Sequence, residues 1–267
     1  MKYFTKFLGV FVIFLLVTSC GSVPITGRRQ LLIVPDAEII SASLTQFDTY
    51  MKTAVKSTDK AKTAMVERVG KNIAAATENY LRQNGMESEI NNFKWEFNTI
   101  KDESVNAFCM PGGKIVVFEG LLPLTASEDE LAVVIGHEVG HAVAKHSNER
   151  MSQELLAQVG ASVVDMALSQ RTAIVQGIGS TVFGLGAQLG VMLPYSRQHE
   201  YEADYLGLVF MTLSGYNPNS ALTFWKKMSA MSGSSDGSDF LSTHPSDNKR
   251  ISEIQKHLPE MEKIRQK

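Results

Sequence analysis

The feature that most constrains this chain is the stretch E-L-A-V-V-I-G-H-E-V-G-H-A-V-A-K-H-S at residues 130–147, which contains the pattern H-E-x-x-H. Ser127, three residues before Glu130, is typical of a helix N-terminus, and the aliphatic residues that follow predict a mostly buried helix. Helical positions four apart differ by about 40° around the axis, so His137 and His141 point the same way. Buried imidazoles need partners, and a divalent cation is a suitable one. The stretch therefore predicts half of a metal site.

A later stretch, S-R-Q-H-E-Y-E-A-D-Y-L-G-L-V-F-M-T-L at residues 196–213, supplies candidates for the other half. Glu200 and Asp204 have the spacing of a third ligand and of a carboxylate that orients an imidazole through its ring N–H, as in gluzincins. Glu202 is the alternative ligand. It lies about 160° around the helix from Glu200, so only one of the two faces the histidines. We favour Glu200 as the ligand.

The residues after H-E-x-x-H do not fit a metzincin, which needs glycine and histidine three and six positions beyond His141. The chain has Ala144 and Ser147 there, and His146 falls one position short. Two imidazoles and a carboxylate suit zinc, and one Zn²⁺ per chain is expected. Glu138, inside the motif, is the predicted general base for a water molecule beside the ion.

Two residues near the C-terminus are further catalytic candidates. T-H-P at 243–245 precedes a predicted helix that begins near Ser246 and contains Arg250. His244 and Arg250 are predicted to donate to the oxyanion of peptide hydrolysis. A second interpretation of His244 stays open, in which its ring takes the open zinc position and keeps the site latent.

Residues 1–19 contain two lysines followed by an apolar run at 7–17, which indicates an export signal. The ending V-T-S-C resembles the bacterial lipoprotein signal, so Cys20 is predicted to carry lipid and to anchor the chain to a membrane. Gly21 favours an outer-membrane position facing the periplasm. A membrane anchor and an ordinary signal peptide cut nearby are the alternatives.

The length of 267 residues and a 44% hydrophobic content allow one compact domain. We assign a signal peptide to 1–19, a tether to 20–34, the metal-binding domain to 35–258 and a charged tail to 259–267. Residues 172–196 carry no charge, but a bilayer crossing there would separate the halves of the metal site, so a buried or lid-like segment is expected. The net charge of -2 gives no support for a nucleic-acid partner.

Hydrophobic periodicity predicts an α+β fold that is mainly helical. Helices are predicted over 36–56 and 60–84. A small antiparallel sheet is predicted next to the H-E-x-x-H helix, from strands at 92–100, 105–110 and 114–118.

The P-G-G sequence at 111–113 suits an irregular edge strand, where exposed backbone groups pair with an extended peptide. An ordinary hairpin turn is an equally good interpretation of the same residues. The predicted substrate-binding edge comprises Asn106, Ala107, Phe108, Gly112 and Gly113.

Five ordered blocks within residues 24–250 resemble the HtpX-like and prenyl-protease-like zinc peptidases, family forty-eight of the metallopeptidases. The blocks are P-I-T-G-R-R-Q-L, N-A-F-C-M-P-G-G, G-H-E-V-G-H-A-V-A-K-H, S-R-Q-H-E-Y-E-A-D and T-H-P. The resemblance implies a zincin-like endopeptidase with His137, His141 and Glu200 as zinc ligands and Glu138 as the base. Members with a lipoprotein start look like bacterial envelope quality-control proteases rather than processors of prenylated substrates.

The expected function is therefore hydrolysis of peptide bonds in misfolded or unassembled envelope proteins, with outer-membrane assembly machinery as an expected partner. A competing hypothesis is an assembly factor or chaperone that holds chains in the same groove without cleaving them. A third is a structural lipoprotein with no metal.

Overall fold

The computed structural model describes residues 20–159, 196–231, 239–244 and 248–266. The predicted signal peptide lies outside these ranges, as does nearly all of the uncharged segment 172–196. The described chain is mainly helical with small sheets, which confirms the predicted fold class. Its helices are α2 (Asp36–Thr53), α3 (Lys60–Gln83), α4 (Glu87–Ile90), η1 (Glu119–Leu124, a 3-10 helix), α5 (Glu128–Val143), α6 (His146–Val159), α9 (Arg197–Leu213), α10 (Ser220–Met231), α11 (Asp239–Thr243) and α12 (Asn248–Arg265).

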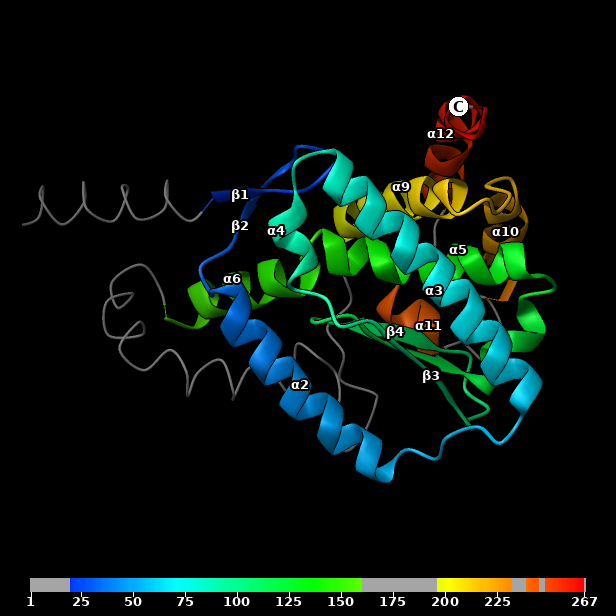
Figure 1. Cartoon of the computed structure of the whole chain (residues 1–267), viewed down its shortest axis with the longest axis horizontal. Coiled ribbons are helices and arrows are strands. Elements are labelled where there is room, and N and C mark those ends of the chain that lie inside the picture. The colour runs from blue at the N-terminus through cyan, green and yellow to red at the C-terminus, as the bar shows by residue number, and fades with distance from the viewer. Residues whose placement is uncertain (1–19, 160–195, 232–238, 245–247, 267) are drawn as a thin grey trace, which may run out of the picture.

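Helix α5 carries the H-E-x-x-H motif through the centre of the molecule, with α9 beside it and α3 crossing the same region (Figure 1). Its N-terminus is capped as predicted, because the Ser127 side chain accepts a hydrogen bond from the backbone N–H of Glu130 at 3.3 Å. The Glu130 carboxylate in turn accepts from the N–H of Ala126 at 2.7 Å. The first bond satisfies a backbone donor that the helix itself leaves unpaired, and the second holds the chain just before the helix.

The close approach of α5 and α9 depends on residues with small side chains. A Cβ added at Gly140 would lie 2.7 Å from the carbonyl oxygen of Ala203, and one at Gly207 would lie 2.8 Å from the backbone nitrogen of His137. Both distances are too short for ordinary contacts, so the two helix backbones meet because no side chain separates them. This contact brings His137 within reach of the residues on α9.

A three-stranded sheet of β3 (Glu96–Ile100), β4 (Ala107–Met110) and β5 (Lys114–Phe118) lies against α5 in the order β3-β5-β4. Strand β4 pairs antiparallel with β5, whereas β3 pairs parallel with β5. The predicted wholly antiparallel sheet is therefore wrong, and the sheet is mixed. After β3, the loop that follows Ile100 leaves room for one strand before β4 begins. Strand β5 then fills this gap and pairs with both β3 and β4.

The P-G-G sequence forms the turn between β4 and β5 instead of extending the edge strand. Gly112 and Gly113 have positive φ angles of 93° and 81°, and the N–H of Gly113 donates to the carbonyl of Met110 at 3.1 Å. Glycine adopts such angles at little cost, whereas other residues are strained there. The predicted substrate-binding edge is thus corrected at Gly112 and Gly113, which lie in the hairpin turn.

The range 20–34, predicted as a tether, contains an antiparallel hairpin of β1 (Cys20–Ser22) and β2 (Arg29–Leu31). Val23 in the connecting loop is buried, and Arg28 forms ion pairs with Glu149 on α6 and Glu202 on α9. The hairpin loop is therefore packed against the metal-binding domain.

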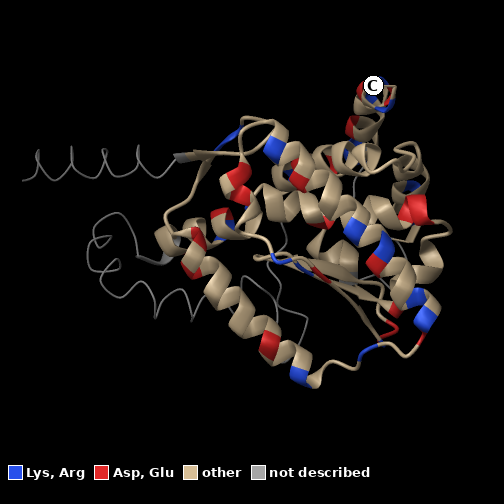
Figure 2. Ribbon diagram, viewed as in Figure 1, with Lys and Arg blue, Asp and Glu red and all other residues tan. Residues whose placement is uncertain are grey.

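Lysine and arginine are interspersed with acidic residues along α3 (Figure 2). None of the helices in the described parts of the chain combines the length and the apolar character needed to cross a membrane.

Candidate metal centre

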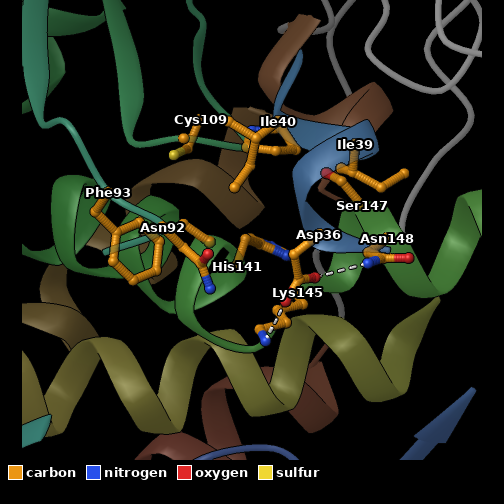
Figure 3. A pocket seen from close by; sticks show the side chains of 13 residues that line it. Asp36, Ile39, Ile40, Asn92, Phe93, Cys109, His141, Lys145, Ser147 and Asn148 are labelled. Carbon is orange, nitrogen blue, oxygen red and sulfur yellow. Dashed lines mark hydrogen bonds and ion pairs between the residues drawn. The ribbon is translucent and has the colours of Figure 1, made fainter. Parts of the chain in front are cut away.

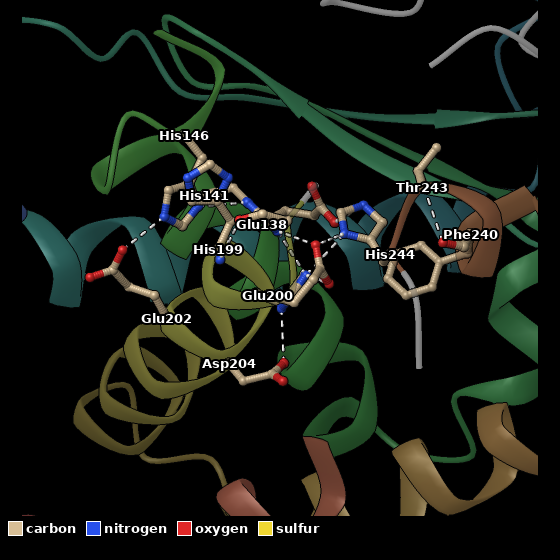
Figure 4. Close-up of polar contacts among 12 residues, drawn as sticks. Glu138, His141, His146, His199, Glu200, Glu202, Asp204, Phe240, Thr243 and His244 are labelled. Carbon is tan, nitrogen blue, oxygen red and sulfur yellow. Dashed lines mark hydrogen bonds and ion pairs between the residues drawn. The ribbon is translucent and has the colours of Figure 1, made fainter. Parts of the chain in front are cut away.

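Four buried side chains from three parts of the chain converge on one point (Figure 4). His137 and His141 come from α5, Glu200 comes from the first turn of α9, and His244 follows α11. Each offers one possible ligand atom, and these atoms all lie within 4.8 Å of one another. The structure thus brings the three predicted ligands together and adds His244 to them.

The spacings between these atoms fit a tetrahedral zinc ion. Ligands at usual zinc distances are roughly 3.3 Å apart in a tetrahedron. The Nε2 atom of His137 lies 3.0 Å from Nε2 of His141 and 3.4 Å from Oε2 of Glu200. Nδ1 of His244 lies 3.1 Å from both His137 Nε2 and Glu200 Oε1. A shared cation would bind the lone pairs of all these nitrogen and oxygen atoms at once.

The Glu200 carboxylate is ionised in this setting. It is fully buried, which by itself raises its pKa, but His244 and Arg250 hold the pKa of Glu200 well below its usual range. An ionised carboxylate is the form that binds zinc.

Asp204 and Arg250 contact the candidate ligands: Asp204 contacts His137, and Arg250 contacts Glu200 and Asp204. Asp204 Oδ1 lies 3.0 Å from Nδ1 of His137, as predicted from the spacing on α9. Arg250 donates to Asp204 through Nε at 2.5 Å and pairs with Glu200 Oε2 at 2.8 Å. Its guanidinium is fully buried and lies 3.5 Å from the centre of the Trp225 ring. This geometry supports a positioning role for Arg250, while its role as an oxyanion donor stays a prediction.

Glu138 lies next to the cluster with one oxygen unsatisfied. Its Oε1 atom is buried without a hydrogen-bond partner among the described residues and lies 3.5 Å from Nε2 of His244. Burial raises the pKa of Glu138 to about 7, and the charge of Glu200 acts in the same direction. A general base is most effective with a pKa near the operating pH. The geometry therefore supports the predicted role of Glu138.

His244 is placed to take the position that a catalytic site leaves open. A structural zinc site has four protein ligands, whereas a catalytic site has three and keeps the fourth position for water. With Nδ1 of His244 among the ligand atoms, the described arrangement supports the interpretation in which this ring keeps the site latent. Its alternative role as an oxyanion donor stays a prediction.

Glu202, the alternative ligand, points away from the metal cluster. Its Oε2 accepts a hydrogen bond from Nε2 of His146 at 3.0 Å and another from Nε of Arg28 at 2.7 Å. The second ring nitrogen of His146 lies 2.8 Å from Nδ1 of His141. The choice of Glu200 over Glu202 therefore agrees with the geometry. Burial lowers the pKa of His146 to about 4, so its ring is neutral near pH 7.

Sequence reasoning gave His146 and Arg28 no role in the metal site. His146 lies five residues after His141, which is a possible clue to its role. It begins the next helix, α6, so the helical spacing within α5 could not predict that it contacts His141. Arg28 carried no local signal, because its partners are more than 120 residues away.

Strand β4 lies at the edge of the sheet, next to α5, so Ala107 and Phe108 have the predicted edge position. Asn106 just precedes the strand, and its carbonyl accepts from the N–H of Phe118 at 3.0 Å. The backbone amide of Cys109 faces the Glu138 carboxylate and lowers its pKa. The edge strand is thus directly beside the predicted base.

A pocket lies at the end of β4 and beside His141 (Figure 3). Ile39, Ile40 and Phe93 give it apolar walls. At its rim, Asp36 accepts hydrogen bonds from Lys145 at 2.7 Å and from Asn148 at 2.9 Å. The pocket therefore combines an apolar lining with a fixed polar rim.

A buried H-E-x-x-H helix joined by a glutamate from a later helix defines the zincin-like metalloproteases of the gluzincin type, and this chain has that fold and that cluster. Residues 39–258 match the model of peptidase family M48. The chain belongs to this family of zinc-dependent metallopeptidases, which confirms the family resemblance.

Relatives with established names show the same relationship. Mitochondrial metalloendopeptidase OMA1 of Schizosaccharomyces pombe is 39% identical over 181 residues, which cover 65% of this chain and 49% of the relative. The Arabidopsis thaliana protein of the same name is 41% identical over 163 residues, 61% of this chain and 31% of the relative. The beta-barrel assembly-enhancing protease of Yersinia pestis is 30% identical over 175 residues, 62% and 35% respectively. The chain spans about half or less of the length of these relatives.

These names contradict the predicted location at a bacterial outer membrane facing the periplasm. The relatives with 39% and 41% identity are named as mitochondrial proteins. The prediction was wrong because it depended on the pattern of residues 1–20, which indicates export but does not identify the membrane. Assignment to a bacterial lipoprotein subgroup is likewise not supported, and lipidation of Cys20 stays a prediction.

Proposed function

We propose that this protein is a zinc-dependent endopeptidase that cleaves extended segments of misfolded or unassembled proteins. The observation that carries the proposal is the position of Glu138, whose unsatisfied oxygen lies beside four converging ligand atoms. A purely structural zinc site has no need of a carboxylate with a free oxygen, whereas peptide hydrolysis needs a base at this place.

His137, His141 and Glu200 hold the ion in this proposal. When bound, zinc lowers the pKa of a water molecule and polarises a peptide carbonyl. Glu138 accepts the proton of the attacking water and delivers it to the leaving amine, for which a pKa near 7 is suitable. Asp204 keeps the His137 ring in the tautomer that presents Nε2 to the ion.

The edge position of β4 supports an extended substrate. A peptide that pairs with the outer edge of Ala107–Met110 runs past Glu138, since the Cys109 amide faces that carboxylate. Folded proteins expose few such extended segments, so unfolded chains are the natural class. The apolar pocket beside His141 supports a preference for a substrate with an apolar side chain near the cleaved bond.

The test compares the wild-type protein with Glu138→Gln, using an unfolded protein substrate and zinc analysis. We expect the variant to keep stoichiometric zinc and to lose cleavage by at least two orders of magnitude. Glu87→Gln is the control, because Glu87 is exposed on α4, and it should cleave normally.

Two results contradict the proposal. Cleavage that survives Glu138→Gln removes Glu138 from its role as the base. Wild-type protein that binds zinc and prevents aggregation of the substrate, yet never cleaves it, supports the competing function of a holding chaperone.

A further inference from the structure

The two ligand imidazoles on α5 are held in different ways. Nδ1 of His137 meets the Asp204 carboxylate directly at 3.0 Å. Nδ1 of His141 instead lies 2.8 Å from Nδ1 of a second imidazole, that of His146, whose Nε2 lies 3.0 Å from Oε2 of Glu202. Both ligand rings are therefore linked to a carboxylate. His141 is linked to Glu202 through the ring of His146 (Figure 4).

The proton positions in the row His141–His146–Glu202 follow from the groups at its two ends, the zinc-binding ring of His141 and the carboxylate of Glu202. When Nε2 of His141 binds zinc, the ring proton of this neutral imidazole sits on Nδ1 and is donated to Nδ1 of His146. His146 then carries its own proton on Nε2 and donates it to Glu202, which can only accept. Each bond has one donor and one acceptor, so the carboxylate fixes the tautomers of both rings.

The carboxylate of Glu202 is held in place by the N-terminal hairpin loop. Nε of Arg28 donates to Oε2 of Glu202 at 2.7 Å, and the hydroxyl of Thr26 donates to the other oxygen of the same carboxylate. His146 is fully buried and Glu202 is 7% exposed. With its partners in place, the carboxylate has little freedom to turn away from His146.

We propose that Arg28, Glu202 and His146 act as a positioning relay for His141, so that the N-terminal hairpin loop sets the metal affinity of the site. The inference rests on the proposed function, because it takes His141 as a zinc ligand. The relay residues do not touch the ion. Their effect is to hold one ligand ring in the tautomer and orientation that zinc needs.

A neighbouring carboxylate offers a matched control. Glu149 is also buried, pairs with the same arginine through Nη2 at 2.7 Å, and accepts from His199 at 3.0 Å. It lies outside the path to His141. A variant at Glu149 therefore disturbs the same buried ionic cluster, including the contacts of Arg28, but keeps the bonds that join Glu202, His146 and His141.

The experiment measures zinc affinity of the full chain by competition with a chelator and records the visible spectrum of the Co²⁺-loaded protein. We expect Glu202→Ala and Arg28→Met to weaken zinc binding by about 10- to 100-fold, with a smaller loss in Glu202→Gln because its amide oxygen still accepts a hydrogen bond. The Co²⁺ spectrum should shift in Glu202→Ala. Glu149→Gln should change neither the affinity by more than about threefold nor the spectrum.

Equal losses in the Glu149 and Glu202 variants overturn the relay, because they show that the cluster acts only through general stability. Unchanged zinc affinity in Glu202→Ala and Arg28→Met, with normal binding by the wild type, overturns it as well. Wild-type protein that fails to bind stoichiometric zinc overturns both the relay and the proposed function. The two results above overturn the relay alone, so the two failures can be told apart.

Discussion

Asp204 Oδ1 lies 3.0 Å from Nδ1 of His137, while Nε2 of the same ring faces Glu200 at 3.4 Å. Two residues one turn apart on α9 thus contact the two nitrogens of one imidazole from α5. The ring is held between a ligand partner and a carboxylate that fixes its tautomer.

Asp204→Asn tests this arrangement, because the amide keeps the size of the side chain and removes its charge. We expect zinc affinity to fall by about 10- to 100-fold and the free energy of unfolding to fall by about 1 to 3 kcal/mol, since Arg250 loses a buried partner. Chelator competition and urea unfolding measure the two effects. Wild-type affinity in the variant would show that His137 needs no carboxylate.

His244→Ala tests the latency of the site. If the His244 ring takes the fourth ligand position, its removal frees that position for water, and cleavage of an unfolded substrate should rise several-fold while zinc stays bound by three residues. His257→Ala is the control, because this histidine lies partly exposed on α12. Loss of cleavage with zinc retained would favour the oxyanion-donor role instead.

Gly140→Ala tests the close contact of α5 and α9. The new methyl group would lie 2.7 Å from the carbonyl oxygen of Ala203, so the helices must separate. We expect the free energy of unfolding to fall by about 1 to 3 kcal/mol and zinc binding to weaken, because Glu200 moves away from His141. Ala64→Leu on the exposed face of α3 adds more volume and should change stability by less than about 0.5 kcal/mol. Denaturation and zinc titration of both variants test the prediction.

Ionisation of Glu149 makes the stability of the fold depend on pH. Although burial opposes the shift, hydrogen bonds from His199 and Arg28 lower the pKa of Glu149 to about 2. A carboxylate with a depressed folded-state pKa stabilises the fold above its unfolded pKa of about 4.5, and this contribution disappears as the pH falls from there through about 2.

Glu149→Gln should therefore be about 1 to 2 kcal/mol less stable than the wild type at pH 7. The difference should shrink steadily below pH 4.5 and be small near pH 2. Urea unfolding of both metal-free proteins at several pH values measures it. A difference that is constant with pH would show that the loss comes from packing and not from the charge.

The local patterns predicted the elements well because their causes are local. The strand at 114–118 corresponds to β5, and the helices predicted from Asp36 and Lys60 begin at those residues. Strand pairing was not predicted correctly, since the parallel contact between β3 and β5 depends on where the loop after Ile100 carries the chain. Periodicity contains no information about such a path.

The sequence by itself determined which residues are candidates to hold the metal, because residues four apart on a helix share a face whatever surrounds the helix. The pair His137 and His141 follows from that rule, and Glu200 was favoured over Glu202 by its spacing to Asp204, a choice with which the described cluster agrees. Only the tertiary structure decided what surrounds these ligands. His244 among the ligands, and Arg28 behind His141 through Glu202 and His146, depend on segments that lie far apart in the sequence and meet only when the core packs.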